Sequence, residues 1–197
     1  MEEMVSMRKK KIYIDFDGVI SDTIATICSL YNDDFQEYPD YEYINWFDVN
    51  SWDFTELKLA DKEYINSYFN QPRFFDRIIL MDHVIHALKS ISKKYDIVVV
   101  SMGNSPNLEL KSFWLRWFED NYDIKIGFIG CEFAKHNDKS SIDMSGCVFI
   151  DDLSNNLRNS NADIKICFGD EYPWNTDWNG IRCYNWMEVL RKLNLEL

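Results

Sequence analysis

Short apolar runs and amphipathic segments alternate along most of the chain, and they predict a repeating order of strands and helices. Asp96–Val100 contains the continuous run Ile-Val-Val-Val, which is typical of a strand buried on both faces. Residues 82–93 place Val84, Leu88 and Ile91 at helical spacing. The expected strands are residues 11–14, 96–100, 124–129, 148–150 and 164–168. The expected helices are residues 23–31, 82–93, a helix that begins at Ser105-Pro106, 153–160 and 186–193. This order predicts an α/β fold with a Rossmann-like parallel sheet and helices on both faces.

Residues 32–76 interrupt this alternation. They contain no strong strand pattern, and Thr55–Asn70 is expected to be helical. The segment is rich in aromatic residues, namely Phe35, Tyr38, Tyr41, Tyr43, Trp46, Phe47, Trp52, Phe54, Tyr64, Tyr68 and Phe69. We therefore expect a small, mostly helical cap at residues 32–76, inserted into a core domain made of residues 1–31 and 77–197.

The charge of the chain narrows the range of partners. The 197 residues carry a net charge of −12, and residues 31–76 alone hold eleven Asp and Glu against three Lys and Arg. An acidic surface repels phosphate backbones, so a nucleic-acid polymer is not an expected partner.

The longest apolar runs are too short to cross a bilayer, and Met1–Lys10 lacks the apolar core of a signal peptide.

The cysteines indicate a reducing compartment. Cys28, Cys131, Cys147, Cys167 and Cys183 include no Cys-x-x-Cys pair, and most of them lie in apolar runs. They are expected to be reduced thiols in or near the core of a cytoplasmic protein, without a disulfide or zinc framework.

Two acidic pairs at strand ends are the first candidates for chemistry. Asp15 and Asp17 follow the first apolar run, and residues i and i+2 of a strand point to the same face. Taken alone, this pair is compatible with an ordinary acidic turn. Asp151 and Asp152 end a second strand, however, and two acidic strand ends in one chain indicate a shared metal site.

Two further polar residues are expected near the same edge of the sheet, because ligands gather at the carboxyl ends of parallel strands. Ser101 follows the Ile-Val-Val-Val run, and Lys139 lies shortly before the strand at 148–150. Lys135 is a nearby alternative to Lys139. Clustered carboxylates and a phosphate require a cation, and an oxygen-rich site suits Mg²⁺. A hydroxyl and an ammonium group can hold phosphoryl oxygens.

The order of these motifs resembles the haloacid dehalogenase-type phosphatases, and it is most similar to the 5′(3′)-deoxyribonucleotidase family. The resemblance rests on Asp15–Asp22 (Asp-Phe-Asp-Gly-Val-Ile-Ser-Asp), on Lys111-x-x-Trp114-Leu115 and on the late Tyr172-Pro-Trp-Asn and Trp186-Met-Glu-Val segments. It implies Asp15 as the nucleophile and Asp17 as the general acid and base.

The same resemblance implies the remaining site residues. Mg²⁺ would be held by Asp15, by the backbone carbonyl of Asp17 and by the Asp151-Asp152 pair, with the direct ligand of that pair left open. Ser101 and Lys139 would contact the phosphoryl group. The chain departs from some relatives after Ser101, where Met-Gly-Asn-Ser contains no basic residue.

The implied function is Mg²⁺-dependent hydrolysis of nucleoside monophosphates through an aspartyl-phosphate, under a mobile cap. Trp46 and Phe47 are the expected stacking platform for a base. The nearest alternative is a phosphatase for another small phosphate ester, such as a sugar phosphate. A signalling receiver domain and a non-catalytic relative of the fold are more distant alternatives, and a homodimer stays open.

Overall fold

The computed structural model describes residues 9–195. Most of the Met1–Lys10 segment, on which the expectation about a signal peptide rests, lies outside this range. Within residues 9–195, no helix is both long enough and apolar enough to cross a membrane.

Six parallel strands form one sheet in the order β3-β2-β1-β4-β5-β6. The strands are β1 (Lys10–Ile14), β2 (Tyr95–Gly103), β3 (Ile126–Glu132), β4 (Val148–Asp151), β5 (Ile164–Phe168) and β6 (Ile181–Cys183). The chain reverses direction across the sheet between β1 and β4, which are adjacent strands. In open parallel sheets, ligands bind beside such a reversal, at the carboxyl ends of the strands.

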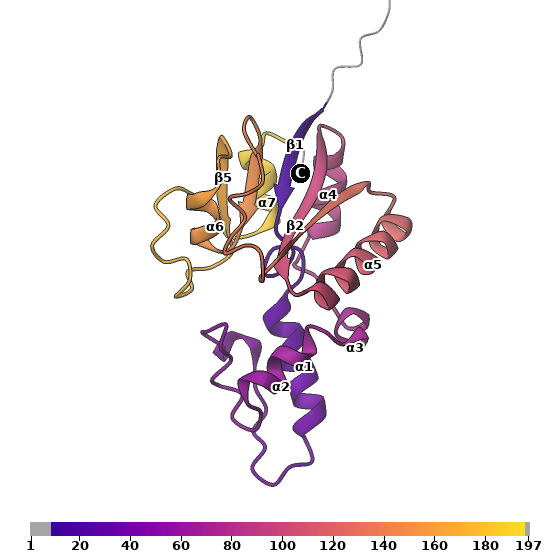
Figure 1. Cartoon of the computed structure of the whole chain (residues 1–197), viewed down its shortest axis with the longest axis vertical. Helices are drawn as coiled ribbons and strands as arrows, with labels where there is room; N and C mark the ends of the chain where they lie inside the picture. Colours follow the sequence, from indigo (N-terminus) through magenta and orange to yellow (C-terminus); the bar gives the residue numbers. More distant parts are fainter. Residues whose placement is uncertain (1–8, 196–197) are drawn as a thin grey trace, which may run out of the picture.

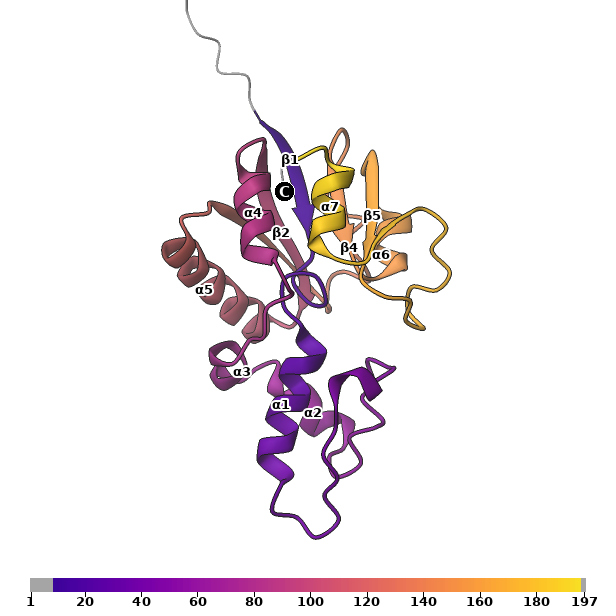
Figure 2. The same cartoon turned by 180° about the vertical axis from the view of Figure 1, so that it is seen from behind.

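Helices cover both faces of the sheet, as the sequence predicts (Figures 1 and 2). Ile12 and Ile14 of β1 belong to the larger apolar core, which they share with α4 (Val84–Ser92), α5 (Ser105–Tyr122) and α7 (Trp186–Lys192). Tyr13, between them, belongs to the smaller core on the side of α6 (Ser154–Asn159). This alternation along one strand is what a sheet buried on both faces requires.

The segment after β1 leads away from the sheet. Helix α1 (Thr23–Phe35) begins at Asp22, whose side chain accepts a hydrogen bond from the amide of Ala25, and it runs continuously toward the tip of the molecule. Between α1 and the return to the core lie a 3₁₀ turn (Trp46–Asp48), α2 (Lys62–Tyr68) and α3 (Pro72–Asp76). In both views this segment projects from the carboxyl end of the sheet (Figures 1 and 2).

The expectation of a helix over Thr55–Asn70 is wrong in its first half. Only Lys62–Tyr68 is helical, and residues 55–60 form turns instead. Asp61 caps α2 by accepting a hydrogen bond from the amide of Tyr64, which places the start of the helix there. Phe54, directly before this stretch, adopts a left-handed backbone conformation with φ of 49°. Strand β6 was not expected from the sequence.

Candidate active site

The carboxyl ends of the central strands bring the sequence-predicted polar residues together. Asp15 directly follows β1, and its amide donates to the carbonyl of Ile150, so the ladder between the strands holds it in place. Asp151 is the last residue of β4. Ser101 lies inside β2, which is three residues longer than the sequence predicts at this end, and its side chain is fully buried.

Three carboxylates form a compact cluster around one ammonium group. Asp15, Asp151 and Asp152 each offer an oxygen, and these oxygens lie within 4.8 Å of one another. Lys139 Nζ lies 2.7 Å from Asp15 Oδ1 and 2.6 Å from Asp151 Oδ2, with its side chain buried. Lys135, the alternative to Lys139, is on the surface and pairs with Glu132.

Asp17 also faces the site but has different partners. Its carboxylate pairs with Lys111 and accepts hydrogen bonds from the hydroxyls of Thr23 (3.0 Å) and Ser101 (3.4 Å). Lys111 Nζ in turn donates to Ser101 Oγ over 2.8 Å. The two carboxylates of the Asp-x-Asp motif are thus held apart in two separate networks, one around Lys139 and one around Lys111.

Lys111 was not predicted as a site residue. Only 1% of its surface is exposed, on a helix whose other buried positions include Leu108, Trp114 and Leu115. These residues are three or four positions away from Lys111 and share its face of α5. A lysine at a core position of an amphipathic helix is the signal that could have identified it, because such a residue requires a buried anion.

Gly18 permits the close approach of the two acidic motifs. It adopts φ of +70°, and a Cβ atom added there would lie 2.7 Å from Asp152 Oδ2. A side chain at this position would therefore both strain the backbone and displace the Asp152 carboxylate.

Burial changes the protonation of the cluster. It raises the pKa of the Asp15 carboxyl to about 7, and the charges of Asp151 and Asp17 add to the rise, against the opposing effect of Lys139. Burial, together with the charges of Asp151 and Asp15, also raises the pKa of Asp152 well above its usual value. For Lys139, burial lowers the pKa, but the adjacent carboxylates of Asp15 and Asp151 outweigh this effect and raise it overall.

The donor set fits a divalent cation. The four carboxyl groups of Asp15, Asp17, Asp151 and Asp152 face two ammonium groups, those of Lys111 and Lys139, so the acidic groups of the site outnumber the basic ones. Carboxylate oxygens are hard ligands of the kind that Mg²⁺ prefers, and neither cysteine nor histidine takes part in the cluster.

A cavity of about 520 Å³ opens beside these groups. Asp15, Asp17, Lys111, Lys139 and Asp152 line its charged end. The remaining lining residues are aromatic, apolar or amide-bearing, namely Trp52, Asn66, Phe69, Met102, Gly103, Asn104, Asn107, Phe133, Asn137, Leu153 and Asn156. The volume is in the range of small-molecule sites.

Two expected platform residues lie elsewhere. Trp46 and Phe47 are 47% and 63% exposed, pack edge-on against each other and are not among the residues that line the cavity. Trp52 and Phe69 are the cap aromatics that do line it. The backbone at Phe69 is held by Asn107 of α5, whose side-chain amide donates a hydrogen bond to the carbonyl of Phe69 over 2.7 Å.

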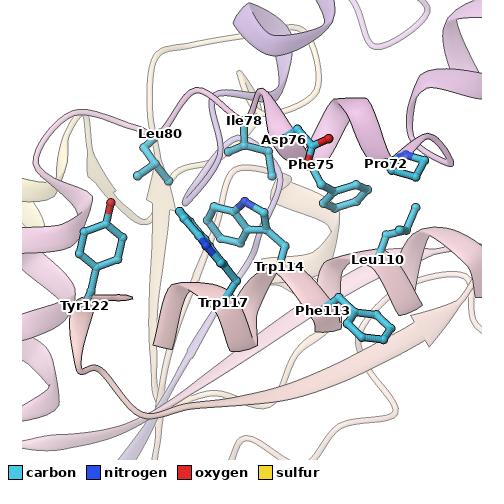
Figure 3. A pocket seen from close by; sticks show the side chains of 10 residues that line it. All are labelled: Pro72, Phe75, Asp76, Ile78, Leu80, Leu110, Phe113, Trp114, Trp117 and Tyr122. Atoms are coloured by element: carbon cyan, nitrogen blue, oxygen red, sulfur yellow. The ribbon is translucent and has the colours of Figure 1, made fainter. Parts of the chain in front are cut away.

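A second cavity, of about 560 Å³, lies between α3 and α5 (Figure 3). Trp114 and Trp117 project toward it from α5, and Phe75 lies opposite them on α3 (Figure 3). None of the predicted site residues lines it, and no lysine or arginine is among the described lining residues. It therefore lacks the groups that a phosphate requires.

Comparison with known families agrees with this geometry. Residues 9–195 match the model of the family described as 5′ nucleotidase, deoxy (pyrimidine), cytosolic type C protein. The chain belongs to this family. It is accordingly a phosphoric monoester hydrolase. A comparison with curated proteins found no match.

Solved structures share the fold of this 5′ nucleotidase family member at low sequence identity. A HAD-superfamily hydrolase of subfamily IA from Geobacter sulfurreducens is 15% identical, with a TM-score of 0.57 over 94% of this chain and 96% of its own. A predicted phosphatase from Clostridium acetobutylicum is also 15% identical, with a TM-score of 0.61 over 95% and 99%. YfnB of Bacillus subtilis, assigned as a HAD-hydrolase and solved with magnesium, is 14% identical, with a TM-score of 0.61 over 95% and 100%.

Proposed function

We propose that the chain is a Mg²⁺-dependent nucleotidase that hydrolyses ribo- or deoxyribonucleoside monophosphates through an aspartyl-phosphate on Asp15. The main support for this proposal is the placement of Asp15 and Asp17. Both line one cavity, but Asp15 pairs with Lys139 and Asp17 with Lys111, so the two carboxyl groups have different surroundings. Two carboxyl groups in different surroundings can take different roles in one reaction. A cation held beside Asp15 would favour the carboxylate form that the nucleophile requires and would oppose the rise in pKa that burial causes.

In the first step, an Asp15 carboxylate oxygen attacks phosphorus and the bond from phosphorus to the ester oxygen breaks. Asp17, in its protonated form, donates its proton to the leaving oxygen, so that the nucleoside departs as an alcohol. Ser101 and Lys111 lie beside Asp17 and are placed to donate hydrogen bonds to phosphoryl oxygens.

In the second step, water attacks the phosphorus of the aspartyl-phosphate. Asp17 is now a carboxylate and removes a proton from this water, while the bond between phosphorus and Asp15 breaks. Inorganic phosphate leaves, and both aspartates return to their starting states. Lys139, 2.7 Å from Asp15, compensates negative charge next to the nucleophile throughout.

Asp15, Asp151, Asp152 and the backbone carbonyl of Asp17 are the groups that would hold Mg²⁺. Bound there, the cation offsets the charge of the substrate phosphate, which four carboxylates would otherwise repel. The carboxylate cluster, in a site where acidic groups outnumber basic ones, supports this proposal.

The lining of the cavity supports a nucleoside as the leaving group. Trp52 and Phe69 offer aromatic surfaces on which a base can stack, and side-chain amides such as those of Asn66 and Asn104 can pair with its polar edge. A sugar phosphate, the alternative, has no flat apolar surface that such aromatic residues would bury. We keep the cap at residues 32–76 as the proposed selector of substrate.

The test is phosphate release from a panel of 5′- and 3′-nucleotides, deoxy and ribo, beside sugar phosphates of the same charge. We expect at least about fivefold higher kcat/KM for nucleotides, since base stacking contributes about 1–3 kcal/mol. EDTA should stop release, and added Mg²⁺ should restore it. Equal rates for sugar phosphates would favour the alternative substrate class, and activity that persists in EDTA would exclude the metal.

A further inference from the structure

The three carboxylates of the cluster are not held equally. Asp15 accepts from the amide of Phe16 and pairs with Lys139, and Asp151 accepts from Lys139, from the amide of Leu153 and from the side chain of Asn156. Among the described residues, the Asp152 carboxylate accepts one hydrogen bond, from the indole Nε1 of Trp174 to Oδ2 over 3.0 Å.

The Trp174 indole is itself fixed from several sides. The ring of Tyr172 stacks on it with the centroids 4.4 Å apart and an interplanar angle of 2°. The ring of Trp52, from the cap, packs against it with the centroids 5.4 Å apart. The backbone is tied as well, since the Ser154 hydroxyl donates to the carbonyl of Trp174 over 3.1 Å.

From this geometry we infer that Trp174 is a positioning residue for the metal site: its indole N–H orients the Asp152 carboxylate so that the oxygens of the cluster converge. The inference rests on the magnesium site proposed above and adds to it a residue that lies 22 positions after the acidic pair. Groups that hydrogen-bond to a metal ligand set its orientation and commonly change metal affinity 10- to 100-fold when they are replaced.

The contact between Trp52 and Trp174 links the proposed role of Trp174 to the cap. Because the cap packs against the group that orients Asp152, the position of the cap and the affinity for the cation are coupled. Such coupling is reciprocal, so a bound cation also favours the arrangement in which Trp52 rests on Trp174.

Two substitutions at the same position separate the hydrogen bond from the packing. W174F keeps an aromatic ring but removes the donor. W174H removes the benzo ring, yet its imidazole can overlay the five-membered ring of the indole, which places Nε2 where Nε1 was. At pH 8 an ordinary imidazole is uncharged and carries one N–H.

The matched control is W178F. Trp178 lies in the same loop, and its indole N–H also donates a hydrogen bond, over 2.9 Å, but to the carbonyl of Ile181. W178F therefore also removes one indole hydrogen bond, but that bond has no contact with the carboxylates of Asp15, Asp151 and Asp152.

The measurement is Mg²⁺ binding to the metal-free protein by isothermal titration calorimetry at pH 8, with folding checked by thermal denaturation. We expect about tenfold weaker binding for W174F, binding within about threefold of wild type for W174H, and no change beyond about twofold for W178F. The half-saturating Mg²⁺ concentration for phosphate release should rise in parallel for W174F, with the KM for substrate unchanged at saturating metal.

Each other outcome overturns the inference. Wild-type affinity in folded W174F would show that the donor is not needed, and a loss in W174H equal to that in W174F would assign Trp174 to packing alone. If W174F does not fold, W174H decides by itself, and failure of both to fold also assigns the residue to packing. Wild-type protein that binds no Mg²⁺ would instead remove the metal site of the proposed function.

Discussion

The active end of the sheet and the cap differ in how their side chains are held. At the sheet, Asp15, Ser101 and Lys139 are at most 7% exposed, and each is fixed by contacts that begin on a strand or its immediate continuation. In the cap, Trp46 and Phe47 lie on a single 3₁₀ turn and are about half exposed or more. Strand ends therefore hold the acidic groups of the site in buried positions, whereas Trp46 and Phe47 lie on an irregular connection that leaves them open to solvent.

The helices of this region are nevertheless joined at one partly buried carboxylate. Asp34 of α1 accepts hydrogen bonds from Arg73 of α3 (2.6 and 2.5 Å) and from the hydroxyls of Tyr68 (2.9 Å) and Tyr64 (3.1 Å) of α2. The irregular part of the cap is thus confined to the segment between α1 and α2, and the helices that flank it form one unit.

The largest effect is expected from D15N. An amide oxygen is a poor nucleophile, so phosphate release should fall at least about 10³-fold for every substrate, nucleotide or not. Phosphate release from a nucleotide and from p-nitrophenyl phosphate measures this, with circular dichroism as the check on folding. Retention of more than about a tenth of the activity would remove Asp15 as the nucleophile.

The second-largest loss of activity is expected from K111M. Methionine fills a similar volume but removes the cation that pairs with Asp17 and donates to Ser101, so kcat/KM should fall about 10²-fold. The matched control is K135M, which removes a lysine on the surface whose partner is Glu132. A change of less than about threefold in K111M would limit this lysine to a structural role.

W52A is expected to act on substrate choice. At saturating Mg²⁺, where any change in cation affinity has no effect, loss of one stacking surface should lower kcat/KM for nucleotides about tenfold and leave that for p-nitrophenyl phosphate within about threefold. F47A is the matched control. Phe47 lies outside the cavity, so its removal should leave kcat/KM unchanged for both the nucleotide and p-nitrophenyl phosphate. A larger effect of F47A than of W52A would support the platform of Trp46 and Phe47 that the sequence predicts.

D34N is expected to have the smallest effect. It should lower the stability of the fold and leave the rate of phosphate release unchanged. The Arg73 guanidinium and the two tyrosine hydroxyls lower the pKa of Asp34, while partial burial opposes them. A carboxyl whose pKa is lower in the folded state stabilises the fold above its unfolded pKa, and the contribution is lost as pH falls through the folded value. We expect D34N to lower the free energy of unfolding by about 1 kcal/mol at pH 7, measured by urea denaturation. The difference should shrink toward pH 3, and a constant difference would contradict the assignment.

The catalytic end of the sheet could be anticipated because a simple rule applies there. The carboxyl ends of parallel strands meet at one edge, so acidic residues at the ends of two apolar runs had to approach one another. Asp15 and Asp151 satisfy this rule directly. Ser101 satisfies it as well, although β2 continues past it to Gly103.

Lys111 escaped this reasoning because it reaches the site from a helix. Its position is set by the helical period of α5 and by the packing of that helix on the sheet, and neither follows from strand ends. The period alone places it among apolar residues, where an ammonium group is unexpected.

The cap resisted prediction for a different reason. Its many aromatic residues follow neither a helical nor a strand period between α1 and α2, so the pattern could not separate Trp52, which lines the cavity, from Trp46, which does not. The turns at residues 55–60 follow the left-handed Phe54 and end where Asp61 caps α2 through a local hydrogen bond.

Helix α1 has a mechanical consequence. It starts at Thr23, directly after the loop that carries Asp15 and Asp17, and its 13 residues make a rigid arm about 20 Å long. At its base, Ser21 forms a bridge with Leu80, and the amide of Asp22 donates to the carbonyl of Ile79, so the outgoing and returning chains cross side by side. A tilt of about 10° at this crossing would move the far end of the arm by about 3 Å, given the length of the arm. Substitutions at residues 20–22 and 79–81 are therefore expected to displace the far end of α1 more than substitutions near that end.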